Sequence, residues 1–225
     1  MRLKSMTELK GYLRDFRLHV PKVISECPGI GIFGRTIRSV LFSTDVSIIR
    51  NSNADAIIAV YPFTPQPVIT QAVMLAADAP VFVGIGGGLT KGERVIGLGK
   101  HAEYQGASGV VVNAPTADET ISALKTQLDI PVIVTVVSER DDIAKRLAAG
   151  AEILNVSAAA KTPELVRKIR ADFPQVPIIA TGGPTEESMR ETIAAGADAI
   201  TWTPPSNGEV FRDVMEAYRQ NKAHP

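Results

Sequence analysis

Short apolar runs alternate with amphipathic segments along most of this chain. One kind of run follows small residues and an acid, as in GADAITWT from Gly196, and the other follows a proline, as in VPIIATGG from Val176. Between such runs lie segments such as 116–129 and 162–173, whose apolar residues recur at three- and four-residue spacing. This spacing is typical of amphipathic helices. The pattern therefore predicts a repeated unit of one strand and one helix.

The repeated unit predicts eight strands. They span residues 39–44, 55–61, 80–86, 108–113, 131–137, 152–157, 177–181 and 198–203. Short apolar strands that are each followed by a helix form parallel sheets with both faces buried. Eight strands favour a closed barrel, because an open doubly wound sheet usually has fewer. The predicted fold class is α/β, a (β/α)8 TIM barrel.

Residues 1–38 do not repeat the unit. Their first half predicts one apolar helical face, formed by Leu9, Tyr12, Leu13 and Phe16. We expect this helical extension to close the bottom of the barrel. The segment 27–34, CPGIGIFG, has the composition of a loop, although its glycines could instead form an irregular first strand. Nothing resembles a linker, so residues 1–225 are predicted to form a single TIM-barrel domain.

Charge and cysteine content narrow the class of partner. Acidic and basic residues balance at 24 each, so no overall field recruits nucleic acid or an anionic membrane. The expected partner is a small molecule, and homo-oligomerisation stays open. Cys27 is the single cysteine, and neither a signal peptide nor a long apolar segment is recognisable. We therefore expect a cytoplasmic protein. We expect no metal, because three histidines and one cysteine show no metal-ligand spacing, and we expect no cofactor.

The active sites of such barrels are built from the carboxyl ends of the strands and the loops after them. Asp45 follows the first strand and is a candidate general acid or base, with a helix N-cap as the equal alternative. Lys161 follows the sixth strand, where a solvated loop lysine is the simpler interpretation. Asn155 lies at the end of that strand in apolar surroundings, where a ligand could satisfy its amide. These three residues are the candidate catalytic groups.

Other residues at the strand ends predict a surrounding pocket. They are Tyr61, Gly86, Gly87, Asn113 and Thr135. A tyrosine before a proline-rich loop could hold its hydroxyl over the barrel mouth, or could be a core residue with a satisfied hydroxyl. The glycines belong to the run GIGGGLTKGE, which is neither a Walker loop nor a clean dinucleotide fingerprint. Close backbone approach to a ligand and loop flexibility explain this run equally well.

The stretch 176–188, VPIIATGGPTEES, ends a strand in Thr181, Gly182 and Gly183, where a helix is predicted to start at once. Backbone N–H groups at a helix N-terminus attract anions. Pro184 can begin that helix, because it has no N–H to lose. The alternative is a tight turn in which a glycine takes a positive φ. The position at the seventh strand favours a phosphate site.

The runs PIIATGG and AAGADAI resemble the phosphate-binding half of the ribulose-phosphate-binding type of TIM barrel. That family includes sugar-phosphate epimerases, decarboxylases and ketodeoxyphosphogluconate aldolases. The resemblance implies that Thr181, Gly182 and Gly183 hold a phosphate. In the family a glycine pair after the eighth strand completes the site, whereas this chain has TPPSN there, and its prolines remove two donors. Ser206, Asn207 and Gly208 are the predicted substitutes.

The leading functional prediction is an enzyme of isomerase, epimerase or lyase type that acts on a small phosphorylated metabolite. The alternatives are a sensor that binds such a metabolite without turning it over, and a hydrolase. The scarcity of charged residues at the strand ends favours the sensor. If Asp45 faces a second ionisable group, the enzyme is favoured. If Asp45 binds only the amides of its own helix, the sensor is favoured.

Overall fold

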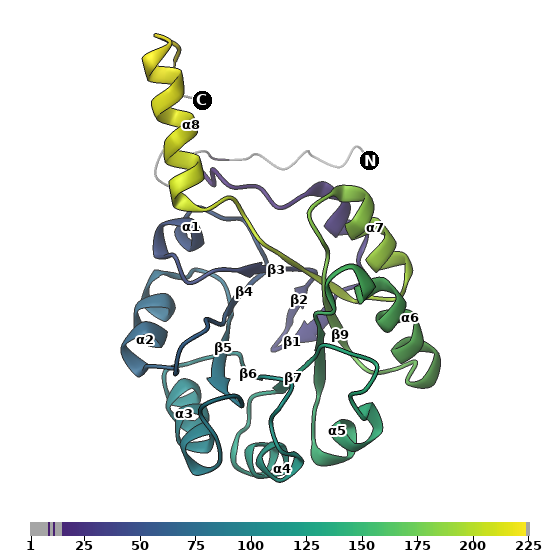
Figure 1. Cartoon of the computed structure of the whole chain (residues 1–225). Coiled ribbons are helices and arrows are strands. Elements are labelled where there is room, and N and C mark those ends of the chain that lie inside the picture. The colour runs from purple at the N-terminus through teal and green to yellow at the C-terminus, as the bar shows by residue number, and fades with distance from the viewer. Residues whose placement is uncertain (1–8, 10, 12–14, 224–225) are drawn as a thin grey trace, which may run out of the picture.

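The computed structural model of the chain describes residues 9, 11 and 15–223. Eight parallel strands close into a barrel in the order β10-β3-β4-β5-β6-β7-β8-β9, and the α-helices except for the last one form a ring around it (Figure 1). The strands are β3 (Ser39–Phe42), β4 (Ala56–Ala59), β5 (Val81–Gly86), β6 (Gly109–Val112), β7 (Val132–Val136), β8 (Ile153–Val156), β9 (Ile178–Thr181) and β10 (Ala199–Trp202). Each lies within the range predicted for it, and the (β/α)8 TIM barrel is confirmed.

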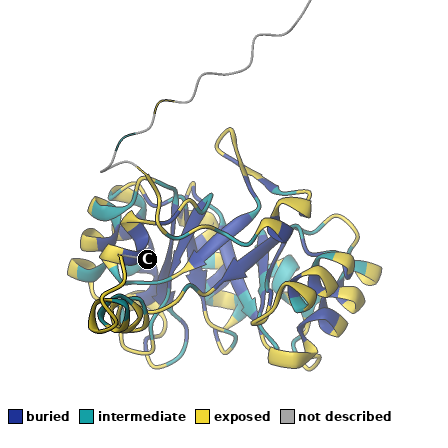
Figure 2. Cartoon of the chain, turned by 90° about the horizontal axis from the view of Figure 1, so that it is seen from above, coloured by how far each residue is buried: buried dark blue, intermediate teal, exposed yellow. Residues whose placement is uncertain are grey.

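A helix follows each strand of the barrel. The helices are α1 (Val46–Arg50), α2 (Pro67–Ala76), α3 (Glu93–Tyr104), α4 (Asp118–Gln127), α5 (Ile143–Ala149), α6 (Thr162–Asp172), α7 (Glu186–Ala194) and α8 (Asn207–Arg219). Two short 3-10 helices, η1 (Lys22–Glu26) and η2 (Ala159–Lys161), lie before the barrel and between β8 and α6. Buried residues concentrate on the strands and on the inner sides of the helices, as Figure 2 shows.

A hairpin formed by residues 30–37 packs into the bottom of the barrel. Strands β1 (Ile30–Ile32) and β2 (Arg35–Ile37) pair antiparallel, and Figure 1 shows them inside the ring of helices. Ile30, Ile32 and Ile37 pack into the inner core of the barrel. The hairpin turns at Phe33 and Gly34, which both have positive φ. The glycine-rich segment therefore forms a strand, but this strand belongs to a separate two-stranded sheet, so the count of eight barrel strands is unaffected.

The proposed apolar helical face falls largely outside this description. Tyr12 and Leu13 lie outside the described residues. Leu9 is exposed, and Phe16 lines a cavity near the hairpin instead of the barrel axis. Within the described part of residues 1–38, η1 is the one helical segment.

Acidic residues anchor the amino ends of the strands. Asp55, Glu152 and Asp198 each precede a strand, and each accepts a hydrogen bond from an N–H group that begins the preceding strand of the barrel. Asp198 Oδ2, for example, lies 2.8 Å from the backbone nitrogen of Ile178. These bonds satisfy amides that a short strand would otherwise leave unpaired. The recurring acid of the sequence repeat is thus a structural device at the bottom of the barrel.

Candidate functional site

A ring of eight side-chain positions lines the mouth of the barrel. One inner residue of each strand belongs to a single buried cluster, and the residue two positions later faces the same side of the sheet. These later positions, which we call the mouth ring, are Phe42, Val60, Gly84, Asn113, Thr135, Asn155, Thr181 and Thr201. The five on β6 to β10 are polar and uncharged, whereas the three on β3 to β5 are not polar. The mouth therefore has a polar half and an apolar half.

Three adjoining cavities open at this ring. The central one has a volume of about 340 Å³, and its neighbours have about 600 and 230 Å³. Val60 and Asn113 line all three. The polar side chains of the central cavity are Asn113, Thr135, Asn155, Ser157, Thr181, Thr201 and Thr203. No ionisable side chain is among the residues that line this central cavity.

Asn155 and Thr135 form one polar pair of the ring. They face each other in register on β8 and β7, and Asn155 Nδ2 donates to Thr135 Oγ1 over 3.3 Å. An asparagine amide can make further hydrogen bonds, because it has two N–H donors and a carbonyl oxygen. The remaining N–H donor and the carbonyl oxygen of the Asn155 amide could bind a ligand with polar atoms. The structure thus places Asn155, which was predicted as a candidate catalytic group, beside the predicted pocket residue Thr135.

The Thr201 hydroxyl is buried and makes no hydrogen bond within the described part of the chain. The residue is 8% exposed. Thr201 lies in register beside Thr181 on β9, and both line the central cavity. An unpaired buried hydroxyl costs roughly 1–3 kcal/mol of folding free energy. Such a group at a cavity wall is expected where a ligand supplies the missing partner.

Asp45 is the N-cap of α1. Its Oδ1 accepts hydrogen bonds from the backbone N–H groups of Ser47 and Ile48, at 2.8 and 3.2 Å, and from the Ser47 hydroxyl at 2.7 Å. The bond from the Ser47 hydroxyl is the main reason that the pKa of Asp45 lies below its ordinary value. Asp45 lines the 600 Å³ cavity, but the residues that line this cavity contain no second ionisable acid or base besides Tyr61. Of the two alternatives for Asp45, these bonds match the cap.

Lys161 and Tyr61 differ in their access to the mouth. Lys161 ends η2, is exposed, and does not line any of the three mouth cavities. The Tyr61 hydroxyl accepts a hydrogen bond from the backbone N–H of Gln66 at 2.8 Å, and Tyr61 lines two of the cavities. A phenol that accepts one bond still has its own proton to donate. Tyr61 is therefore the candidate proton donor of the mouth.

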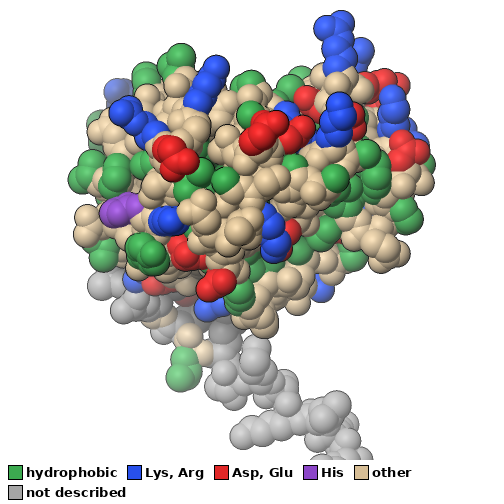
Figure 3. All heavy atoms as spheres, turned by 90° about the horizontal axis from the view of Figure 1, so that it is seen from below, with side chains coloured by type: hydrophobic (Ala, Val, Ile, Leu, Met, Phe, Trp, Pro, Cys, Tyr) green, Lys and Arg blue, Asp and Glu red, His purple; other side chains and the backbone are tan. Residues whose placement is uncertain are grey.

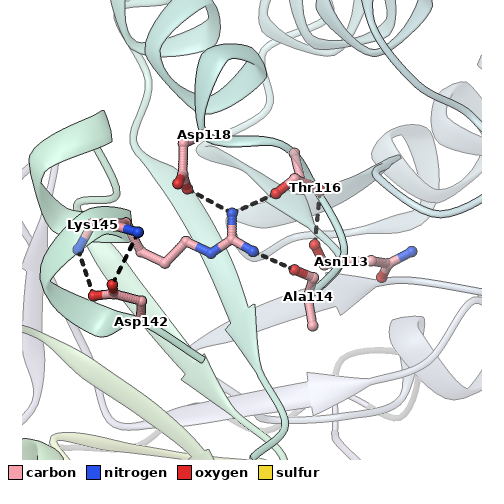
Figure 4. Close-up of polar contacts among 7 residues, drawn as sticks. Asn113, Ala114, Thr116, Asp118, Asp142 and Lys145 are labelled. Carbon is pink, nitrogen blue, oxygen red and sulfur yellow. Dashed lines mark hydrogen bonds and ion pairs between the residues drawn. The ribbon is translucent and has the colours of Figure 1, made fainter. Parts of the chain in front are cut away.

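Asn113 is held by the loop between β6 and α4. Arg146 of α5 donates to the carbonyl oxygens of Thr116 and Ala114, the latter at 2.6 Å, and pairs with Asp118 at 2.7 Å (Figure 4). The Thr116 hydroxyl in turn donates to the carbonyl oxygen of Asn113 at 2.7 Å. Because the side chain of Arg146 is only 15% exposed, this clamp fixes the loop that carries Asn113.

The two predicted pocket glycines have different roles. Gly86 has a φ of 120° and lines the 230 Å³ cavity together with Tyr61 and Asn113. Gly87 has a φ of 102°, and a Cβ atom there would lie 1.8 Å from Thr116 Oγ1. Only glycine fits that close approach. Gly87 thus supports the clamped loop, whereas Gly86 forms part of the cavity wall.

The two halves of the predicted phosphate site lie in separate cavities. Thr181 lines the central cavity, whereas Ser206 and Asn207 line the larger one beside Asp45. The Gly182 amide donates to the Thr201 carbonyl oxygen at 3.3 Å, so it is already paired. Gly183 has a φ of 77°, which agrees with the tight turn. None of the three mouth cavities is lined by Gly182, Gly183 or Gly208.

Capping boxes occupy both helix starts of the predicted phosphate site. The helix α7 begins at Glu186 with Thr185 as N-cap, so Pro184 precedes the helix and does not begin it as we expected. At α8 the Ser206 amide and hydroxyl both donate to Glu209 Oε2, at 2.8 and 2.7 Å. These bonds lower the pKa of Glu209, the Ser206 hydroxyl being the main cause. A phosphate at α8 would have to displace this carboxylate.

Charge elsewhere on the molecule is mixed. Figure 3 looks onto the side of the barrel opposite α8 and shows acidic and basic side chains interspersed. Among the described residues, no group of three or more His, Cys, Asp or Glu side chains could hold a metal ion. No helix in the described part of the chain is long and apolar enough to cross a membrane. A cytoplasmic location and the absence of nucleic-acid or membrane partners stay predictions.

Sequence reasoning did not commit to Thr201 and its neighbour Thr203. Thr201 interrupts an otherwise apolar strand at the position two residues after the inner Ala199. The same step of two residues leads from the inner Ile153 to Asn155 and from the inner Ile179 to Thr181, and both of these were predicted as site residues. Applying this step to all eight strands would have found the whole mouth ring.

Comparisons with known proteins bear on the fold. No protein-family model matches the chain, and no curated protein sequence matches it. Among solved structures, a 2,3-dimethylmalate lyase of the PEP mutase/isocitrate lyase superfamily superposes with a TM-score of 0.64 at 14% identity, over 89% of this chain and 86% of the lyase. A phosphonopyruvate hydrolase superposes with a TM-score of 0.62 at 15% identity, over 89% of this chain and 86% of the hydrolase. A phosphoenolpyruvate phosphomutase from Streptomyces platensis subsp. rosaceus superposes with a TM-score of 0.61 at 14% identity, over 88% of this chain and 83% of the mutase.

These likenesses concern architecture, because all three identities are low and one barrel fold carries many chemistries. The resemblance to ribulose-phosphate-binding barrels is not what they show, and it stays a prediction. They establish that this chain has the (β/α)8 barrel fold of known lyases and mutases.

Proposed function

We propose that this chain binds a small, oxygen-rich metabolite at the barrel mouth through uncharged hydrogen-bonding groups and acts as a sensor of that metabolite. The observation that carries this proposal is the unpaired Thr201 hydroxyl in the wall of the central cavity. The cavity volume of about 340 Å³ lies in the range of small-molecule sites. A compact carboxylic acid or its phosphate ester has the size and the acceptor atoms for this site.

The polar half of the mouth ring supplies both donors and acceptors. Threonine hydroxyls and asparagine amides can donate to carboxylate or phosphate oxygens without carrying a charge. Thr181 and Thr201 lie on adjacent strands, and Asn155 and Thr135 lie on the next two. The apolar half, with Phe42 and Val60, would face the carbon skeleton of the ligand.

Binding without turnover is favoured because no ionisable side chain is among the residues that line the central cavity. Proton-transfer catalysis requires a group with a suitable pKa within hydrogen-bond reach of the reacting atom. The carboxylate of Asp45 is engaged by its own helix, and Lys161 is exposed outside the cavities. These observations support the sensor over the enzyme that the sequence favoured.

A lyase- or isomerase-type enzyme is the second candidate. It is supported by the fold shared with a dimethylmalate lyase, a phosphonopyruvate hydrolase and a phosphoenolpyruvate phosphomutase. It is also supported by Tyr61, whose hydroxyl proton is available at the edge of two cavities. In this candidate Tyr61 would protonate the product, and the mouth ring would hold the substrate.

The test is a thermal-shift screen with carboxylic acids of two to six carbons and their phosphate esters. A ligand at a hundredfold its Kd adds about 2.7 kcal/mol to the free energy of unfolding. In Thr201→Val the lost hydroxyl should weaken the affinity about tenfold, while the unfolding free energy without ligand stays equal or rises by about 1 kcal/mol. Affinity that is unchanged in Thr201→Val would exclude the proposed site.

Thr192→Val is the matched control. Thr192 is also buried, but its hydroxyl donates to the Ser188 carbonyl oxygen at 2.9 Å. Its replacement should lower the unfolding free energy by about 1 kcal/mol and leave the affinity unchanged. Proton NMR of each stabilising ligand over hours then separates the two candidates. Turnover that disappears in Tyr61→Phe would establish the enzyme in place of the sensor.

A further inference from the structure

The 600 Å³ cavity, which we call the outer cavity, differs in character from the central cavity. Hydroxyl and amide side chains predominate in the lining of the central cavity. The apolar side chains that line the outer cavity, to which the ring of Tyr61 adds, are Phe42, Ile48, Val60, Pro62, Pro204 and Pro205. Phe42, at the end of β3, is 41% exposed. Apolar surface that faces water is covered favourably by an apolar group of a ligand.

The outer cavity and the central cavity share a long boundary. Phe42, Val60, Asn113 and Thr203 line both of them. The 230 Å³ cavity shares only Val60 and Asn113 with the central one. Asn113 belongs to the loop that the Arg146 clamp holds, so this part of the boundary is fixed (Figure 4). A ligand in the central cavity therefore has more room to extend into the outer cavity than into the smaller one.

Proline-rich loops form two walls of the outer cavity. Pro62 follows β4, and Pro204 and Pro205 follow β10. A proline has no N–H group, so the loop after β10 offers fewer donors to an anion. Its fixed φ keeps the loop in one shape, and a wall that is already ordered costs little entropy when a ligand binds. These walls suit an apolar group better than a phosphate.

Asp45 gives the ligand a direction. Its carboxylate lines the outer cavity, whereas no ionisable side chain is among the residues that line the central cavity. Like charges repel, so an anionic head group is disfavoured beside Asp45. The central cavity also contains the unpaired Thr201 hydroxyl, which can donate to an oxyanion. The head group is therefore expected in the central cavity and the apolar group in the outer one.

We propose that the ligand is an amphipathic acid, whose oxyanion head binds in the central cavity and whose apolar chain or ring fills the outer cavity. This inference rests on the proposed function and adds an apolar subsite to it. Phe42, which lines both cavities, is then the residue that selects for the apolar group. Thr201 selects for the head.

Isothermal titration calorimetry with straight-chain 2-hydroxy carboxylic acids of three to eight carbons tests the proposal. Each added methylene that enters the outer cavity should raise the affinity about three- to fourfold. The heat-capacity change of binding should also become more negative with chain length, because more apolar surface is buried. The gain should end once the outer cavity is filled.

Two variants locate the apolar group. Phe42→Ala removes an apolar wall, and Thr44→Trp places a large side chain at a position that lines only the outer one of the three mouth cavities. Each should lower the affinity of the eight-carbon acid about tenfold or more and that of the three-carbon acid less than about twofold. Thr201→Val should weaken both acids by the same factor, because its hydroxyl contacts the shared head group.

Leu75→Ser is the control for non-specific adsorption of the longer acids. Leu75 is 80% exposed on α2 and lines none of the three mouth cavities. Its replacement should change neither the short nor the long acid. Far-UV circular dichroism and Tm verify that each variant folds.

The outcomes separate this inference from the proposed function. If no acid of any length binds, both fail. If the short acids bind through Thr201 but the affinity does not rise with chain length, only the apolar subsite is overturned. The subsite is also overturned if the gain persists undiminished in both Phe42→Ala and Thr44→Trp, because the apolar group would then lie elsewhere. An equal loss in Leu75→Ser would show that the longer acids adsorb to exposed apolar surface.

Discussion

The two ends of the barrel differ in how their polar groups are bonded. At the bottom, Asp55, Glu152 and Asp198 each accept a hydrogen bond from the backbone N–H that begins a neighbouring strand. At the mouth, the Thr201 hydroxyl has no hydrogen-bond partner among the described residues. The isoleucines of the β1–β2 hairpin fill the barrel interior at the bottom, and a cavity of about 430 Å³ lies beside the hairpin, whereas three adjoining cavities open at the mouth. Three strands are thus anchored by hydrogen-bonded carboxylates at the bottom, whereas five strands lead to uncharged polar side chains at the mouth, among which the Thr201 hydroxyl is unpaired. Hydrogen-bonded carboxylates at the bottom serve stability, and a mouth with spare hydrogen-bonding capacity serves a ligand.

The largest effect is expected from the bottom. Asp198 pairs with Arg170 at 2.7 Å and accepts the Ile178 N–H, and its side chain is 22% exposed. Asp198→Ala removes the carboxylate that the Arg170 guanidinium and the Ile178 N–H bind, and it should lower the unfolding free energy by about 2–3 kcal/mol. Urea denaturation followed by circular dichroism measures this. Asp213→Ala, at an exposed position of α8, should cost less than about 0.5 kcal/mol. Equal losses in the two variants would contradict the structural role of the bottom layer.

A smaller effect is expected at the clamp beside the mouth. Arg146→Met removes three polar contacts to the loop that carries Asn113 and should cost about 2 kcal/mol. Hydrogen exchange of residues 113–118 should accelerate in the variant. The neighbouring Lys145→Met is the control, because Lys145 is exposed and pairs with Asp142 only at 3.5 Å. If exchange in this loop does not change, the clamp does not hold Asn113.

The smallest effect concerns Asp45 and depends on pH. Because hydrogen bonds hold the pKa of its carboxyl below the ordinary value of 3.8, the cap stabilises the protein above that value and is lost as the pH falls through the folded-state pKa. Asp45→Ala should therefore cost about 1 kcal/mol at pH 7, and this cost should shrink under acid. Asp45→Asn keeps a capping group and should lose less. A cost in Asp45→Ala that does not depend on pH would show that the ionised carboxylate is not the cap.

The fold could be predicted from the sequence because each strand–helix unit is short and carries its own period. The eight strands fall within their predicted ranges for this reason. The pocket was predictable in part, since Asn155, Thr135 and Asn113 are polar residues at the ends of apolar strands. The hydrogen bonding at the predicted phosphate site could not be predicted from the sequence. Whether an amide is free depends on bonds such as those from Gly182 to Thr201 and from Ser206 to Glu209.

The sequence alone determined the barrel, its strand positions and the alternation that places threonine and asparagine side chains at the mouth, because these follow from periods of two and of three to four residues within one segment. Only the tertiary structure decided that Asp45 caps α1 and that the hairpin fills the bottom. Each of these outcomes depends on which of several competing partners a group meets. That competition is settled by closure of the barrel, which brings residues 38 and 200 into contact.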